Sequence, residues 1–217
     1  MILNINGFQV DVAEVPTTIP GLLFMPQMRN FHNNEDWSRF TKGRPVEVSH
    51  ADYNLAHEVG AQYMTHGIME IGVSRNGAGS FTNALLTAKP DNIPYLGVDL
   101  DDKSYLDNAE KRIHTIRSDS FNQLMVREKA RSIGMDKISI LFIDGWHSVN
   151  AVINDWLYSD LLADNGIVFF HDTNSHPGPT VFLHAIDPTQ YRVEKHFEDL
   201  DDFGVSVAYK IAQQLSK

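Results

Sequence analysis

The sequence predicts an α/β domain with a doubly wound, mostly parallel sheet, and two observations lead to this prediction. The first is a pair of short apolar runs, residues 138–143 and 167–170, each of which ends at acidic or imidazole side chains. Buried parallel strands are continuous apolar runs of this kind. The second is the segment between them, residues 149–162, whose apolar side chains recur at helical spacing. A strand, a helix and a strand in this order form a right-handed βαβ unit.

Polar residues follow both of these strands. Asp144 and His147 come after the first, and His171 and Asp172 come after the second. Ligands of open α/β sheets bind at the carboxyl ends of the strands. We therefore expect these four side chains to converge on one crevice.

The other elements follow from the same two patterns of apolar residues. In chain order they are a helix at 49–66, a strand at 68–72, a helix at 81–87, strands at 95–98 and 113–116, a helix at 121–131, a helix at 181–186, and strands at 191–197 and 205–209. The last two strands have no helix between them. They should pair as an antiparallel hairpin at the carboxyl-terminal edge of a seven-stranded sheet.

Composition limits the function classes. With 217 residues, 42% of them hydrophobic, the chain can build one sizeable domain. The formal net charge of −10 argues against nucleic acid or an anionic membrane as the main partner. There is no cysteine, which excludes disulfides and thiolate metal sites. No segment resembles a signal peptide or a membrane span, so we expect a cytoplasmic protein.

Residues 1–48 differ from the remaining 49–217, which hold the α/β pattern. They contain four prolines and no sustained periodicity. Weak alternation over residues 1–15 predicts a small hairpin that turns at Asn6 and Gly7. We treat 1–48 as an amino-terminal extension: a loop packed across the sheet, a substrate lid or an oligomer contact.

Candidate ligand-binding residues follow the first three strands. Glycines 72, 77 and 79 would allow a ligand to approach the backbone closely, or would simply form a tight turn. Asp99 ends the second strand, where a carboxylate can accept from both hydroxyls of a ribose, although it could also belong to an acidic cluster with its neighbours. Asp119 could accept from the amine of a purine or cap the following helix.

Five segments stand in one order: EIGVSRNGAGS, VDLDD, RSDS, IDGWH and FFHDT, followed by the terminal FGVSVAYK. In this order they resemble the class I S-adenosylmethionine-dependent methyltransferases, whose fold is Rossmann-like. More narrowly, the chain is similar to the metal-dependent O-methyltransferases, which include the catechol and macrolide-sugar enzymes and proteins named for cephalosporin hydroxylation. The resemblance covers about residues 50 to 210 and implies that 49–217 is a methyltransferase domain.

The resemblance implies a role for each matching residue. The cofactor positions fall on Glu70, Gly72, Ser80, Asp99, Asp119, Ser120 and Asp144, the divalent metal on Asp144, His171 and Asp172, and the general base on His147. There are two departures from the family pattern. The glycine loop is longer, with shifted glycines. His171 stands where relatives often carry an acidic or apolar residue, so it is either a nitrogen ligand or a neighbour of the metal, with Thr173 or Asn174 as third ligand.

The chemistry of these residues agrees with the resemblance. Methyl transfer from a sulfonium to oxygen needs a deprotonated hydroxyl. Mg²⁺ held by carboxylates can lower the pKa of that hydroxyl, and an imidazole can take the proton. We therefore predict an S-adenosylmethionine-dependent, metal-assisted O-methyltransferase acting on a small hydroxylated molecule, a sugar or glycoside before a phenol. His176, in the loop after the second strand, is a lesser candidate for substrate contact.

Two alternatives stay open. A non-haem iron oxygenase could use the same His and Asp residues, because two histidines and a carboxylate form a facial triad. A non-catalytic cofactor-binding protein of the same fold would bind the cofactor without turnover. A homo-oligomer is compatible with each of these functions.

Overall fold

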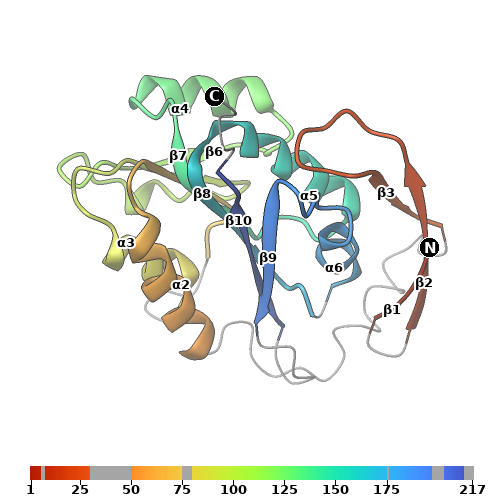
Figure 1. Ribbon diagram of the computed structural model, residues 1–217. Helices are drawn as coiled ribbons and strands as arrows, with labels where there is room; N and C mark the ends of the chain where they lie inside the picture. The colour runs from red at the N-terminus through yellow and green to blue at the C-terminus, as the bar shows by residue number, and fades with distance from the viewer. Residues whose placement is uncertain (6–7, 30–49, 75–79, 175, 197–202, 213–217) are drawn as a thin grey trace, which may run out of the picture.

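The computed structural model describes residues 1–5, 8–29, 50–74, 80–174, 176–196 and 203–212 (Figure 1). These residues form one large sheet with helices on both faces and one small sheet at its side. The statements below concern these residues. Among their helices, none is long and apolar enough to cross a membrane.

The large sheet has seven strands. In spatial order they are β6 (Ile113–Arg117), β5 (Tyr95–Asp99), β4 (Gly67–Ile71), β7 (Ile138–Ile143), β8 (Leu162–His171), β10 (Val205–Lys210) and β9 (Tyr191–His196). The first five are parallel, and β10 is antiparallel to both β8 and β9. The predicted fold class is confirmed. Chain order reverses between β4 and β7, which is the point where such sheets bind ligands.

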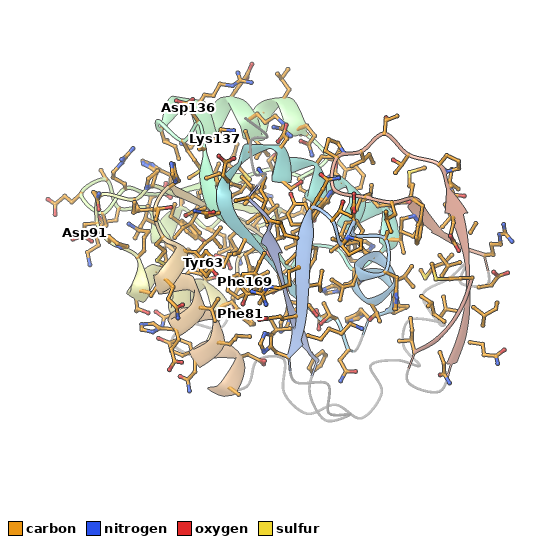
Figure 2. All side chains as sticks on the ribbon, viewed as in Figure 1. Tyr63, Phe81, Asp91, Asp136, Lys137 and Phe169 are labelled. Atoms are coloured by element: carbon orange, nitrogen blue, oxygen red, sulfur yellow. The ribbon has the colours of Figure 1, made fainter. Side chains whose placement is uncertain are left out.

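Helices cover both faces of this sheet (Figure 1). They are α2 (His50–Tyr63) and α3 (Phe81–Ala88) on one face, and α4 (Gln123–Ser132), α5 (Val149–Trp156) and α6 (Pro177–Leu183) on the other, with short 3₁₀ turns η2 (Ser104–Leu106) and η3 (Leu157–Leu161). Successive side chains of β7 alternate between the two apolar layers: Phe142 packs towards α3, and Leu141 towards α5. Figure 2 labels Phe81, the first residue of α3, and Phe169 of β8, which both belong to the apolar layer between α3 and the sheet.

Some element boundaries differ from those expected. The helix predicted over 149–162 ends at Trp156, and a 3₁₀ turn leads into β8 at Leu162. Arg127 of α4 contributes to the end of α5, because its Nη2 donates to the carbonyl of Leu157 at 2.9 Å. The helix expected at 181–186 starts instead at Pro177, where the fixed φ of proline favours a first turn.

Gly67, expected at the end of the first helix, begins β4 instead, while α2 already ends at Tyr63. A Cβ at Gly67 would lie 2.5 Å from the side chain of Met135, so a larger residue there would have to displace Met135. Ser49, the first residue of that predicted helix, lies outside the described residues. The start of β8 lies five residues before the predicted 167, and the other predicted strand starts and ends lie within one residue of those observed.

The amino-terminal residues form a three-stranded sheet of β1 (Ile2–Ile5), β2 (Phe8–Val15) and β3 (Met25–Met28). Pairing of β1 with β2 confirms the expected hairpin, whose turn at 6–7 lies outside the described residues; β3 was not expected. The sheet packs beside α5 and α6: Trp156 Nε1 donates to the Pro20 carbonyl at 3.0 Å, and Leu22 bridges to Ile186. The lid or oligomer contact within 1–48 stays a prediction, and residues 30–49 are outside the described part.

Candidate functional site

A cavity of about 950 Å³ opens at the carboxyl ends of the parallel strands. Most of the residues predicted from the sequence line it. They are Gly72, Asp99, Asp119, Ser120, Asp144, His147, His171 and Asp172, with His176 beside them. Among the described lining residues, Glu70 and Ser80 are not found. The expected convergence at one crevice is observed, and the cavity has two chemically different ends.

Asp99 occupies the end of β5, at one end of the cavity. Its Oδ2 accepts from the main-chain N–H of Val73 at 2.8 Å, and its Oδ1 accepts from that of Asp101 at 2.7 Å. The ammonium of Lys103, only 5% exposed, lies 3.8 Å from Oδ2. Asp101 and Asp102 are exposed, so Asp99 is not simply one of a solvated acidic group. Its carboxylate is fixed by the main chain and faces the cavity.

Asp119 and Ser120 line the same end of the cavity. Asp119 Oδ1 accepts from the N–H of Phe121 at 3.0 Å within a turn. The helix that was expected from 121 begins at Gln123 and is capped by Asn122, so Asp119 is not its cap. Phe121, 56% exposed, offers an apolar surface on which a flat ring could rest.

Gly72 allows the ends of β4 and β7 to meet. Its φ is +84°, and a Cβ there would lie 2.0 Å from the carbonyl oxygen of Asp144. The N–H of Asp144 in turn donates to Ile71 at 2.8 Å. The tight-turn interpretation therefore holds for Gly72, which also lines the cavity, whereas glycines 77 and 79 lie outside the described residues.

Glu70 lies fully buried inside β4. Its carboxyl accepts from Thr82 Oγ1 at 2.6 Å and from the hydroxyl of Tyr95. Thr82 Oγ1 also accepts from the N–H of Ser74 at 3.0 Å, so Glu70 is linked to the turn after β4. Burial raises the pKa of Glu70 to about 8. The geometry fits a residue that supports the turn rather than one that faces the cavity.

Ser80 is the amino cap of α3. Its Oγ accepts from the N–H of Asn83 at 3.1 Å, and it is 4% exposed. Capping of a helix is a common role of a serine at this position. A cofactor contact for Ser80 stays a prediction.

At the other end of the cavity, Asp144, His147, His171 and Asp172 form a compact polar cluster. His147 Nε2 lies 2.6 Å from Asp172 Oδ2 and 3.7 Å from Asp144 Oδ1. His171 Nδ1 lies 3.2 Å from Asp144 Oδ1 and 3.3 Å from Asp172 Oδ2. Two strands supply all four residues: β7 leads into the first two, and β8 into the others.

Asp172 has a left-handed backbone conformation, with φ of +58°. Few residues with a side chain adopt this conformation, and Asp is among those that do so more often. The loop that holds it is tied on both sides: the N–H of His176 donates to the Asp172 carbonyl at 2.9 Å, and Thr180 Oγ1 donates to the Thr173 carbonyl at 2.7 Å. The carboxylate is thus aimed by a fixed loop.

The charges in the cluster depend on one another. Burial alone would lower the pKa of His147, but hydrogen bonds to Asp144 and Asp172 and their charges raise it to about 9. The pKa of His171 is likewise raised well above its usual value by the two carboxylates, against the effect of burial. Burial alone would raise the pKa of Asp172. The charge of His171 and the hydrogen bond of His147 outweigh burial and hold this pKa well below its usual range.

The donor atoms of Asp144, His171 and Asp172 lie within 4.8 Å of one another, close enough to hold one cation. Two carboxylates suit Mg²⁺, and an imidazole adds affinity for first-row transition metals. Thr173 and Asn174 face a separate cavity of about 280 Å³, so His171 fits the third position better than either of them. The residues present therefore fit a divalent cation.

Sequence reasoning underrated His176 and did not single out Thr82, Tyr95 or Lys103. The ring of His176 stacks on that of His147, with centroids 4.1 Å apart and planes within 11°. The only signal for it was its position in the loop after β8. Thr82 and Tyr95 contact Glu70, and Lys103 contacts Asp99. No local sequence pattern indicates these contacts.

Comparison with known proteins gave one family and many similar folds. A family model described as a methyltransferase domain matches residues 69–173. Comparison with curated protein sequences gave no match. Among solved structures, one from Staphylococcus aureus, described as of the caffeoyl-CoA O-methyltransferase type, is 13% identical, has a TM-score of 0.57, and is covered over 90% of its length by 81% of this chain.

Two further structures have the same fold. An O-methyltransferase from Bacillus cereus, in complex with S-adenosylhomocysteine, is 13% identical with a TM-score of 0.56 over 83% of this chain and 93% of its own. The MycE methyltransferase of mycinamycin biosynthesis is 16% identical with a TM-score of 0.53 over 84% of this chain, which spans 55% of MycE. The matched segment, residues 69–173, contains all the residues predicted for the cofactor, the cation and the base, but not the lesser candidates Asn174 and His176. Residues 69–173 are therefore similar to a methyltransferase domain, and the chain has the same fold as the solved O-methyltransferases.

Proposed function

We propose that this protein transfers the methyl group of S-adenosylmethionine to a hydroxyl group of a small molecule, with help from a divalent cation. One observation carries the proposal. A single cavity joins a carboxylate suited to a ribose, Asp99, to a cluster of two carboxylates and two imidazoles suited to a cation and a proton. Binding and chemistry would thus take place side by side.

The cofactor would lie along the ends of β4, β5 and β6. Asp99 presents a carboxylate that is already held by two N–H groups and can still accept from the two hydroxyls of a ribose. Asp119 and Ser120 would lie beside the adenine, and Phe121 would cover its face. When bound, the cofactor supplies a positively charged sulfonium and its methyl group.

Asp144, His171 and Asp172 would hold the cation. A bound Mg²⁺ or similar ion would polarise the acceptor oxygen and lower the pKa of its hydroxyl. Residues of this chain would shape the cavity around the cofactor and the cation. Gly72 and Asp144 fix the turn against which the cofactor lies, and the aromatic ring of Phe81 lines the cavity next to His171.

His147 would accept the proton of the hydroxyl at Nε2, with Asp172 orienting its ring. Without a cation its pKa of about 9 keeps the ring protonated at neutral pH, because both carboxylates act on it. When the charge of these carboxylates is neutralised, the pKa of His147 falls towards its usual value. Cation binding and readiness of the base are therefore linked.

The two alternatives find less support. An iron oxygenase would use the histidines and Asp172 but would leave Asp99 and Asp119, at the other end of the cavity, without a purpose. A non-catalytic binding protein would not need an imidazole held 2.6 Å from a buried carboxylate in a strained turn. For the acceptor, we propose a sugar or glycoside hydroxyl first and a phenol second. MycE, which was crystallised with Mg, S-adenosylhomocysteine and mycinamycin VI, lends support to the first.

The test is calorimetric titration of S-adenosylmethionine into metal-free protein, repeated with Mg²⁺, followed by a screen of hydroxylated acceptors with labelled methyl groups. We expect micromolar binding and label transfer that a chelator abolishes. Absence of cofactor binding under both conditions would overturn the proposal. Binding with transfer that ignores the chelator would remove the cation from it.

A further inference from the structure

His176, beside this cluster, completes a second set of donor atoms, of which the proposed function uses His147 and Asp172 in other roles. His147, Asp172 and His176 each offer one atom, and these three atoms also lie within 4.8 Å of one another. Asp172 belongs to both sets, since its Oδ2 lies 2.6 Å from His147 and 3.3 Å from His171. The first set offers two oxygens and one nitrogen, and the second offers one oxygen and two nitrogens.

The second set is built into the fold. The main-chain N–H of His176 donates to the Asp172 carbonyl, and the carbonyls of His176 and Thr173, each 2.7 Å from Thr180 Oγ1, share the one hydroxyl proton of Thr180. Asp172 is 5% exposed, whereas His147 and His176 are partly exposed and line the large cavity. A cation could therefore enter from the cavity and find room there for further ligands.

The donor types select the cation. Mg²⁺ prefers oxygen and rarely takes two imidazoles, whereas Zn²⁺, Co²⁺ and Ni²⁺ bind imidazole nitrogen well. Two histidines and one carboxylate, with open positions, are a common set for such metals. The two sets thus differ in the metals they favour even though they share a carboxylate.

We propose that His147, Asp172 and His176 form a second, nitrogen-rich cation site, and that a zinc-like divalent cation bound there inhibits the enzyme. Inhibition follows because His147, the base of the proposed function, becomes a ligand and can no longer accept a proton. This consequence rests on the proposed function, whereas the site itself does not. The parallel stack of the two rings must open for both to face one ion, since planes within 11° do not converge.

Cobalt(II) titration followed by visible absorption tests the site without any turnover. We expect wild-type protein to develop the absorption of nitrogen-ligated cobalt. His176→Gln should weaken cobalt binding ~10-fold or more and remove most of that band, since one of three protein ligands is lost. Asp144→Asn should keep the band, because Asp144 belongs only to the first set. His184→Gln, an exposed histidine after α6, serves as the matched control and should change nothing.

Cobalt binding that His176→Gln leaves unchanged, or that Asp144→Asn abolishes, would overturn the second site. His147→Gln repeats the test from the other ring, and circular dichroism shows that each variant is folded. In an activity assay with saturating Mg²⁺, added Zn²⁺ should inhibit wild type at ~10-fold lower concentration than His176→Gln. If no methyl transfer is found, the proposed function fails while the cobalt result still decides the site.

Discussion

The two ends of the cavity hold their carboxylates by different means. At the end of β5, both oxygens of Asp99 accept from main-chain N–H groups, at 2.8 and 2.7 Å. At the ends of β7 and β8, Asp144 and Asp172 face two imidazoles instead, and the pKa of each histidine is raised by these carboxylates against the effect of burial. One end is fixed by the backbone, and the other by side-chain charges that depend on one another.

This difference matches what each end is proposed to do. A group that only binds a ribose should keep one position and one charge, and main-chain donors ensure both. A group that exchanges protons and cations has to change its charge, and a network of carboxylates and imidazoles does so readily. Changes at the first end should therefore reduce affinity, and changes at the second should reduce rate.

The largest expected effect is at the charged end. His147→Ala should lower kcat by about 10²–10⁴-fold, the usual contribution of a positioned base, while affinity for S-adenosylmethionine stays as in wild type. Steady-state kinetics and calorimetry measure the two quantities. The exposed His184→Ala is the control. Equal losses of rate and cofactor affinity would show that the charged end of the cavity also contributes to cofactor binding.

The charged end was predictable because strand ends follow from local pattern. Runs 138–143 and 167–170 are apolar enough to be recognised as strands. Because neighbouring parallel strands end at the same edge of the sheet, Asp144 and Asp172, which follow them, come together. The stacking of His176 on His147 was not predictable, since it depends on the left-handed turn at Asp172 and on Thr180. Asp adopts a left-handed conformation more often than most residues do, but this preference does not indicate which Asp of a chain will do so.

The second prediction concerns Glu70, which is buried in β4 and accepts from the hydroxyls of Thr82 and Tyr95. Burial raises its pKa to about 8, so the folded protein binds a proton that the unfolded chain releases near its ordinary value of 4.5. Stability should therefore fall as pH rises from about 5 to 8, by roughly 3 kcal/mol from this group. Glu70→Gln, which is neutral throughout, should remove this fall.

Denaturant unfolding at pH 5, 6.5 and 8 measures the effect, with the exposed Glu58→Gln as control. An unchanged pH dependence in Glu70→Gln would show that the Glu70 carboxyl is charged in the folded protein. The partners of Glu70 could not be predicted from the sequence. Thr82 lies 12 positions and Tyr95 25 positions along the chain, and only the pairing of β4 with β5 and the packing of α3 bring them together.

The third prediction tests the backbone-held end. Asp99→Ala should weaken S-adenosylmethionine binding by about 10–100-fold, because a charged hydrogen-bond acceptor is worth ~1.5–3 kcal/mol, while kcat at saturating cofactor changes little. Asp102→Ala, an exposed neighbour outside the lining of the cavity, is the matched control. A loss of rate without loss of affinity would contradict the assignment of this end to binding.

The smallest effect is expected at Ser80, where the resemblance implied a cofactor contact and the structure shows a helix cap. Ser80→Ala should lower the free energy of unfolding by ~1 kcal/mol, the usual value of such a cap. Cofactor affinity should not change, because Ser80 is not among the described residues that line the cavity. Asn122→Ala, which removes the cap of α4, gives a matched loss of stability. If Ser80→Ala weakens cofactor binding tenfold or more while Asn122→Ala does not, the hydroxyl touches the cofactor, and the binding end extends beyond its backbone-held carboxylate to the start of α3.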